Sequence, residues 1–160
     1  MIFEKADTDD IKELVELRIA YLLEDHGGIP QSSLSLIAEK LPEYFREHLN
    51  NDLLVFVCRN ENSIVSCCFL YISEKPPNPS FISGKTGTVL NVYTRPQFRR
   101  KGIAAELIRA LLKEAKAKEL DYVELKATDA GYGFYKSLGF EDMVSKYHNM
   151  KYIIDDRNEL

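Results

Sequence analysis

Three cations, Arg99, Arg100 and Lys101, stand where a helix is expected to begin, and Gly102 follows them. A helix N-terminus carries a partial positive charge, so cations there are unfavourable unless an anion binds. Free backbone N–H groups at a helix start point toward such an anion, and glycine lets the backbone approach it closely. The segment therefore predicts a phosphate-binding turn, and the alternative is a solvated basic helix start that binds nothing.

The kind of phosphate ligand depends on which motifs the chain has. Neither the loop motif G-x-x-x-x-G-K-[ST] nor the dinucleotide fingerprint G-x-G-x-x-G occurs in the sequence. What remains is R-x-x-G-x-A, from Arg99 to Ala104, directly after an expected strand. With its flanks, VLNVYTRPQFRRKGIAAELI, this segment resembles the acetyl-coenzyme A signature [QR]-x-x-G-x-[GA] of the GCN5-related N-acetyltransferases (GNAT).

A second motif lies downstream and supports the same resemblance. The segment FYKSLGF, residues 134 to 140, is similar to the Tyr-x-x-x-Gly-Phe ending of that family. The two motifs occur in the family's order, with one long helix and one strand expected between them. The chain departs from the pattern at Arg100, where many members carry glycine, and at Ala104, which replaces the second glycine. We expect these departures to alter cofactor contacts rather than abolish binding.

The resemblance implies a set of residues that bind acetyl-CoA as the cosubstrate. The strand residues Val92, Tyr93 and Thr94 would run beside its pantetheine arm, and one of their N–H groups would polarise the thioester carbonyl. Thr128 and Gly131 stand where the family often has Asn and Ala. The signature would hold the pyrophosphate through Arg99 and, with backbone N–H groups, through Arg100, Lys101, Gly102, Ile103, Ala104 and Ala105.

The implied chemistry is acyl transfer from a thioester to an amine. Tyr135 would lie near the sulfur, and we expect it to act as the general acid that protonates the leaving thiolate. The alternative is an amphipathic core tyrosine beside Phe134. No general base stands out from the sequence. Ordered water could take the proton of the amine, or one of four side chains could: Glu24, His26, Glu43 and His148. Side chains of these types are more often plain surface residues.

Three residues of the expected N-terminal helices could contact the acceptor amine. Arg18 falls on an apolar helix stripe, where it could anchor an acidic group of the acceptor or extend its head group into water from the edge of the stripe. Tyr21 and Tyr44 could line the acceptor site, although tyrosines in helices are more often half-buried core residues. The resemblance does not identify the acceptor, because these two helices vary most within the family.

The elements that must position these residues can be read from hydrophobic spacing. The expected order is β-α-α-β-β-β-α-β-α-β-(β), an α/β fold with a mixed central sheet flanked by helices, as the GNAT resemblance also implies. The helical spacing is strongest from Gly102 onward. The other expected elements are strand 2–5, a helix from Asp7 or Thr8 to Gly27–Gly28, helix 33–50, a hairpin of 53–58 and 63–73, strand 87–94, strand 122–127 and a short helix closed by Gly139.

Two of these expectations carry specific reasons. Pro42 disfavours helix at Leu41, so helix 33–50 is expected to kink or to divide into two short helices. The segment FEDMVSKYHNMKYII is expected to form one or two final strands. Since members of the family often pair through such strands, a homodimer is one expected assembly.

Length and composition limit the classes of protein to which the chain can belong. The 160 residues predict a single domain, 1–160, and the net charge of −4 argues against nonspecific nucleic-acid binding. The chain has no apolar run of the ~18 residues that a membrane span needs, and its acidic start lacks a signal-peptide pattern. The three cysteines show no metal-ligand spacing, so no metal site is expected. We therefore expect the cysteines to behave as small hydrophobic residues, and we expect the protein to occupy a reducing compartment, the cytoplasm.

Three functions fit these observations. The first is an acetyl-CoA-dependent N-acetyltransferase that acts on a primary amine of a small molecule or peptide. The second is a non-catalytic coenzyme A sensor or structural module on the same fold. The third is nucleic-acid binding through the basic segment 95–101, which would be sensitive to salt. Since a sensor would not need a general acid, the presence of Tyr135 favours the enzyme.

Overall fold

The computed structural model describes residues 1–155 and divides the chain into two compact units. The first unit is Met1–Lys126, and the second begins at Ala127. The predicted phosphate-binding turn belongs to the first unit and Tyr135 belongs to the second.

The first unit is built on a five-stranded sheet with the strand order β1-β2-β3-β4-β5. The first four strands pair antiparallel and β5 pairs parallel to β4, so the expectation of a mixed sheet is confirmed. The strands are β1 (Ile2–Lys5), β2 (Leu53–Asn60), β3 (Ser63–Glu74), β4 (Lys85–Thr94) and β5 (Val123–Glu124). The last strand is shorter than the expected 122–127.

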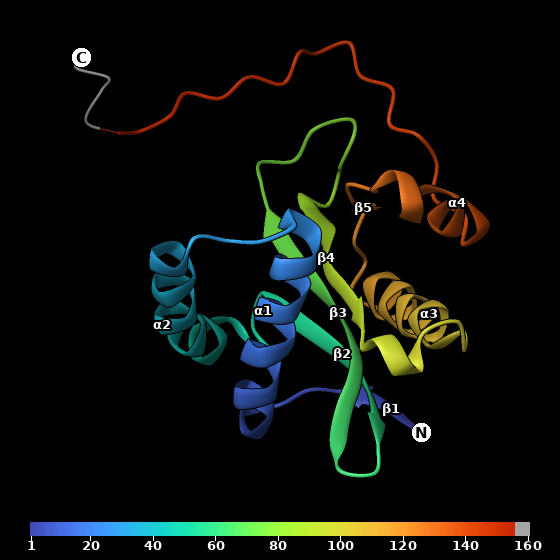
Figure 1. Ribbon diagram of the computed structural model, residues 1–160. Coiled ribbons are helices and arrows are strands. Elements are labelled where there is room, and N and C mark those ends of the chain that lie inside the picture. Colours follow the sequence, from blue (N-terminus) through green and yellow to red (C-terminus); the bar gives the residue numbers. More distant parts are fainter. Residues whose placement is uncertain (156–160) are drawn as a thin grey trace. The chain divides into compact units, whose positions relative to one another are not determined.

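Helices cover both faces of this sheet. The helices α1 (Ile11–His26) and α2 (Gln31–His48) lie on one face, and α3 (Ile103–Ala117) lies on the other (Figure 1). Cys67 and Cys68 show the consequence: neighbouring strand residues point to opposite faces, yet both side chains are fully buried. The expectation of buried, unpaired cysteines is confirmed, since Cys58 is also buried and free.

The termini of α1 follow from local sequence. A short 3-10 helix, Thr8–Asp10, precedes it, and Asp7 caps that turn in a capping box with Asp10. Gly27 ends α1 in a left-handed conformation with φ 63°. The buried residues of α1 are Leu14 and Leu17, among the residues that the structure describes.

Helix 33–50 was expected to kink or to divide at Pro42. The division is wrong, because α2 is one continuous helix with this proline inside it, and the kink stays a prediction. Tertiary packing explains the difference. Phe45, the next apolar position, is fully buried, and its ring packs edge-on against Phe69 with a centroid distance of 5.8 Å. The burial of such a ring offsets the hydrogen bond that proline removes.

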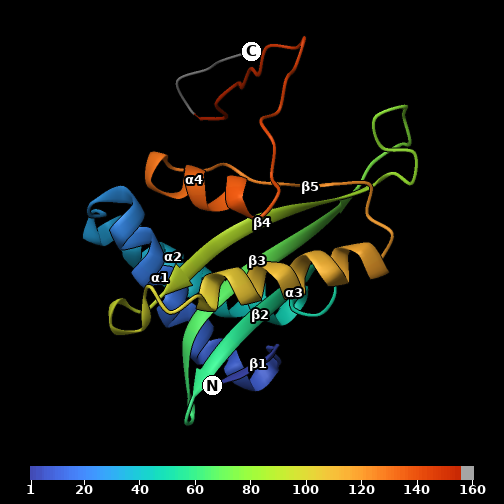
Figure 2. The same ribbon diagram turned by 90° about the vertical axis from the view of Figure 1, so that its right-hand side faces the viewer.

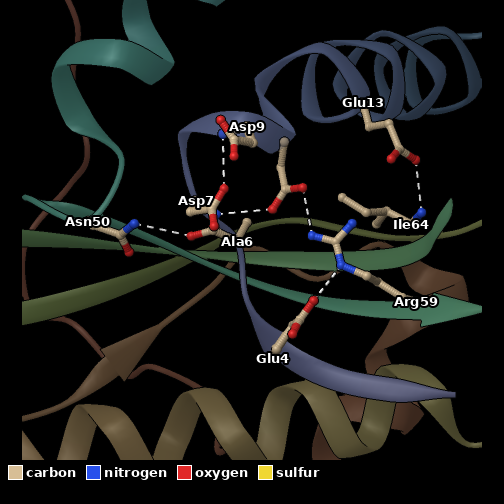
Figure 3. Close-up of polar contacts among 9 residues, drawn as sticks. Glu4, Ala6, Asp7, Asp9, Glu13, Asn50, Arg59 and Ile64 are labelled. Carbon is tan, nitrogen blue, oxygen red and sulfur yellow. Dashed lines mark hydrogen bonds and ion pairs between the residues drawn. The ribbon is translucent and has the colours of Figure 1, made fainter. Parts of the chain in front are cut away.

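An ion-pair cluster fixes the N-terminal edge of the sheet (Figure 3). The Arg59 side chain on β2 donates from Nε to Glu4 on β1, and from Nη2 to Asp10 Oδ1 over 2.6 Å. Only 19% of the Arg59 side chain and 10% of the Asp10 side chain are exposed. Paired carboxylates, Asp10 first, raise the pKa of the Arg59 guanidinium. We call this cluster of Glu4, Asp10 and Arg59 the Arg59 clamp.

The pairing of β3 with β4 contains a β-bulge that the sequence did not predict. Cys67 pairs with Tyr93 and Phe69 pairs with Leu90, so one residue of β3 faces two residues of β4. Asn91, one of these two, has a left-handed φ of 53° and is 3% exposed. Bulges bend a strand and redirect its side chains. This bulge therefore bends β4 just before its end, where Tyr93 and Thr94 pair with β3 again.

The second unit contains α4 (Asp129–Ser137). Thr128 caps it by accepting from the Gly131 N–H over 3.2 Å, and Gly139 follows it with φ 93°, as expected for a helix end. The expectation of final strands is wrong within residues 138–155, which contain no strand. A strand needs a pairing partner, and no strand pairs with this segment among the described residues.

Candidate functional site

The predicted phosphate-binding turn joins the end of β4 to the start of α3 (Figure 2). A short 3-10 turn, Pro96–Phe98, follows β4, and α3 begins at Ile103. Between them, Arg100 has φ 60° and Gly102 has φ 77°, so two left-handed residues lie within three positions. Such alternation turns successive N–H groups toward one point, which makes an anion-binding concavity. The expected order of strand, turn and helix is confirmed, with Ile103, Ala104 and Ala105 in the first turn of α3, and phosphate binding at this turn stays a prediction.

The backbone at this turn faces open space. A Cβ atom built on Gly102 would meet no heavy atom within 4 Å, among the residues that the structure describes. The first intrahelical acceptor of α3 is the Gly102 carbonyl, which accepts from Glu106 N over 3.2 Å. The N–H groups before Glu106 are those that have no acceptor within a helix. The turn therefore combines unpaired donors, a helix dipole and room for a ligand.

The three cations of the turn have different surroundings. Arg99 donates from Nη2 to Glu24 Oε2 of α1 over 2.6 Å and from Nε to the Thr94 carbonyl over 2.8 Å. The bond to Glu24 raises the pKa of the Arg99 guanidinium. Lys101 Nζ lies 5.1 Å from the centre of the Phe98 ring. Arg99 thus ties the turn to α1, and its role in cofactor binding stays a prediction.

The end of β4 is open on the side of β5. The two strands pair only at Gly87 with Val123 and at Thr88 with Glu124, where β5 ends. From Val89 to Thr94, β4 continues without a partner on that side, among the described residues. Val92, Tyr93 and Thr94 lie in this stretch, and all three are half-buried. An extended ligand could add beside them as a further strand would.

The bulge residue Asn91 contacts Arg18, which sequence analysis singled out on α1. Arg18 Nη1 donates to Asn91 Oδ1 over 3.2 Å, and Asn91 Nδ2 donates to Cys67 Sγ over 3.4 Å. The Arg18 guanidinium lies 5.6 Å from the centre of the Tyr21 ring. Burial lowers the pKa of Arg18, which is half-buried. Sequence analysis missed Asn91, and the signal that could have found it is an asparagine between Leu90 and Val92, since asparagine is rare in strands and tolerates positive φ.

Tyr21 and Tyr44, the other predicted acceptor residues, are also half-buried, and burial raises the pKa of both phenols. The Tyr44 ring packs on the core and lies 4.4 Å from the His48 ring. His48 Nδ1 is in turn 2.7 Å from Asp52 Oδ1. Tyr44 therefore combines core packing with a position near Arg18, and Tyr21 is also near Arg18, as the electrostatic effect of Arg18 on both phenols shows.

The surroundings of the four candidate general bases do not favour any one of them for this role. All four are exposed, which fits the reading of surface residues: Glu24, His26, Glu43 and His148. Glu24 is paired with Arg99, and His26 Nε2 lies 3.7 Å from Asp25 Oδ2. Among residues 1–155, no group of three or more His, Cys, Asp or Glu side chains could hold a metal ion.

In the second unit, Tyr135 is half-buried on α4 between two aromatic rings. Its ring centre lies 5.1 Å from that of Phe134 and 5.8 Å from that of Phe140. A Cβ on Gly131 would lie 3.2 Å from Tyr135 Cε2, so glycine makes room for this ring. Thr128 and Gly131 thus form the first turn of α4 and seat Tyr135. Their predicted contact with the cofactor stays a prediction.

Comparison with known proteins gives a consistent picture. The sequence model of the acetyltransferase (GNAT) family matches residues 15–140. Among solved structures, the chain is similar to a predicted acetyltransferase with acetyl-CoA from Clostridium acetobutylicum, at 30% identity and a TM-score of 0.81, covering 94% of this chain and 95% of that one. No curated protein sequence matches closely enough to count as a relative.

Two further structures share the fold at lower identity. A GCN5-related N-acetyltransferase from Ralstonia eutropha JMP134 is 21% identical with a TM-score of 0.76, covering 93% of this chain and 97% of that one. Glucosamine-6-phosphate N-acetyltransferase from Arabidopsis thaliana is 20% identical with a TM-score of 0.67, covering 96% and 98%. Within residues 1–155, no helix is both long enough and apolar enough to cross a lipid bilayer.

Proposed function

Because the chain belongs to the acetyltransferase (GNAT) family, we propose that it is an acetyl-CoA-dependent N-acetyltransferase that acts on a primary amine of a small molecule or peptide. The observation that carries this proposal is the turn between β4 and α3. Its two left-handed residues, Arg100 and Gly102, its unpaired N–H groups and its open space suit a pyrophosphate. The residues present therefore fit the group that the family binds.

The opening of β4 fits the rest of the cosubstrate. We assign Val92, Tyr93 and Thr94 to the pantetheine arm, because their strand lacks a β5 partner there. Ser66 Oγ donates to the Tyr93 carbonyl over 2.9 Å, which fixes this strand end from the β3 side. A backbone N–H on a strand end that is held in this way can point at the thioester carbonyl oxygen. One such donor stabilises the transition state of acyl transfer by about 3 kcal/mol.

The chemistry is direct attack of the amine on the thioester carbonyl, through a tetrahedral intermediate. Acetyl-CoA supplies the acetyl group, and the amine becomes an amide while coenzyme A leaves as a thiol. We assign Tyr135 as the general acid for that thiolate. A phenol of ordinary pKa, about 10, is a weaker acid than a thiol of about 8.5, so this transfer depends on positioning. Only the neutral amine can attack, so the acceptor ammonium first loses a proton to ordered water or to an exposed base.

We further propose that the two units form one domain, 1–160, because the family match at 15–140 spans both. The buried free cysteines fit a reducing compartment, so we propose a cytoplasmic protein. Binding of nucleic acid or membranes and dimer formation are separate questions, to be measured by salt-dependent binding and by solution mass.

The experiment that tests the function is calorimetric titration with acetyl-CoA, followed by thiol release across a panel of amines. Gly102→Glu places a negative charge at the turn and should weaken acetyl-CoA binding about a hundredfold. Gly102→Ala is the matched control, because it meets the same positive φ without the charge. Equal affinity of wild type and Gly102→Glu would contradict the assigned turn.

The general acid is tested in the same assay with Tyr135→Phe. This variant should bind acetyl-CoA normally and lose turnover about a hundredfold, because the ring stays and only the proton donor is removed. Unchanged turnover would remove Tyr135 from the mechanism. Tight binding of acetyl-CoA without turnover on any amine, even in the wild type, would instead favour a coenzyme A sensor.

A further inference from the structure

Arg18 has an unusual environment for a half-buried arginine. Its Nη1 donates to a neutral amide, Asn91 Oδ1, and its guanidinium lies against the Tyr21 ring. No carboxylate lies within ion-pair distance of it among the residues that the structure describes. Buried charges are costly unless they are paired, so an arginine in this position is expected to have an anionic partner.

The groups that act electrostatically on Arg18 do not supply that anion. In order of effect they are Tyr21, Tyr44, Cys67 and Asp25. Burial raises the pKa of both tyrosines, and that of Cys67 to about 12, so these three are neutral near pH 7. Asp25, the only acid, has the smallest effect and lies 3.7 Å from His26. The positive charge of Arg18 is therefore largely uncompensated.

The position of Arg18 relates this charge to the proposed chemistry. Arg18 is held by Asn91, which directly precedes Val92, Tyr93 and Thr94. These three residues are assigned to the pantetheine arm, and one of their N–H groups is assigned to the thioester carbonyl. One to three residues of extended chain span about 3–10 Å. An anion bound by Arg18 would therefore lie within a small molecule's length of the carbonyl under attack. The Tyr21 ring lies against the same guanidinium, and Tyr44 is close enough to act on it electrostatically.

From this geometry we propose that Arg18 binds the carboxylate of the acceptor, and that the acceptor is a small amine carrying an acidic group a few bonds from its nitrogen. Arginine suits this role, because its planar guanidinium can donate two parallel hydrogen bonds to one carboxylate. Asn91 holds the guanidinium in place and leaves its other donors for the ligand. This inference names the acceptor class and rests on the proposed acetyltransferase function.

The test compares matched acceptors: amino acids, the corresponding amino acid amides, and aminoalkyl phosphonates, with thiol release as the readout. Wild type should prefer the acids. Arg18→Met should lower the ratio of kcat/KM for acid over amide about tenfold to a hundredfold, mainly through KM. Arg18→Lys keeps the charge without the fork and should fall between. Arg109→Met, at an exposed ion pair with Glu106 on α3, is the matched control and should leave the ratio unchanged.

Binding is measured separately, as the thermal shift that each acid or amide causes in the presence of coenzyme A. A shift with acids that Arg18→Met removes, without acetyl transfer, would support the inference and contradict the proposed function. Transfer to amines with an acid-to-amide ratio that Arg18→Met does not change would support the function and overturn the inference. The inference would also be overturned if the acids caused no thermal shift and were not preferred over the amides as acceptors. A preference for phosphonates over carboxylates would overturn the carboxylate assignment.

Discussion

Two arginines of the first unit show how differently the same side chain can be used. Arg59 is held by Glu4 and Asp10, and this pairing raises its pKa (Figure 3). Arg18 is held by a neutral amide, and burial lowers its pKa. Neither side chain is fully exposed to solvent, but of the two only Arg59 forms ion pairs with carboxylates of its own chain. An arginine whose anion is internal stabilises the fold, whereas one whose anion is missing is available for a ligand.

The largest effect that this comparison predicts is on stability. Arg59→Met leaves Asp10, which is 8% exposed, without its cation, and should lower the free energy of unfolding by about 2 kcal/mol. This corresponds to a fall in Tm of about 4–8 °C for a chain of this size. Arg18→Met removes an uncompensated charge and should change stability by less than about 1 kcal/mol. Denaturant unfolding of both variants measures the difference, and equal losses would contradict the comparison.

A second variant should make Arg18 resemble Arg59. Asn91→Asp places a carboxylate where Oδ1 now lies, 3.2 Å from the guanidinium, and aspartate tolerates the positive φ of this bulge. The internal acid should compete with an acidic acceptor and raise its KM about tenfold. Acetylation kinetics with an amino acid and its amide measure this change. The double variant with Arg18→Met leaves the new acid unpaired and should be less stable than either single variant; a more stable double variant would exclude the pairing.

The smallest effect concerns pH and the thiol beside Asn91. Burial raises the pKa of Cys67 to about 12, while an unfolded chain loses this proton near pH 8.5. Between these values the native state binds more protons than the unfolded state, so stability falls as pH rises, by about 1 kcal/mol per unit. The Arg59 clamp adds no slope there, because its guanidinium stays charged. Unfolding at pH 9 and 10 should show a flatter dependence in Cys67→Ala; an equal slope would contradict this assignment.

The sequence was most informative where local rules determine the structure. The helical spacing from Gly102 onward located α3, whose buried residues include Leu107, Ile108 and Leu111, and the signature from Arg99 to Ala104 located the turn before it. Left-handed backbone at Gly102 follows from the residue itself. These features depend on spacing and residue type over a few positions, which a single sequence displays.

The sequence was least informative where distant segments decide. The bulge at Asn91 arises from the pairing of β3 with β4, and the bond from Arg99 to Glu24 joins residues that are 75 positions apart. The continuous α2 depends on Phe45 packing against Phe69. The expected strands in 140–154 had the composition of strands but no pairing partner among the described residues. Each of these outcomes depends on a contact that hydrophobic spacing does not encode.

The adjacent cysteines of β3 have a consequence for how accurately the sheet assembles. A slip of one residue in strand pairing normally moves apolar side chains to the wrong face, and this penalty keeps a strand in place. At Cys67 and Cys68 the slip exchanges two identical side chains between two buried faces, so this pair contributes no such penalty. Correct alignment of β3 with β4 must be enforced nearby, where Ser66 Oγ lies 2.8 Å from Thr94 Oγ1 and Asn91 occupies its bulge. Asn91, which lies at the proposed acceptor site, thus also helps to keep β3 and β4 in the correct register.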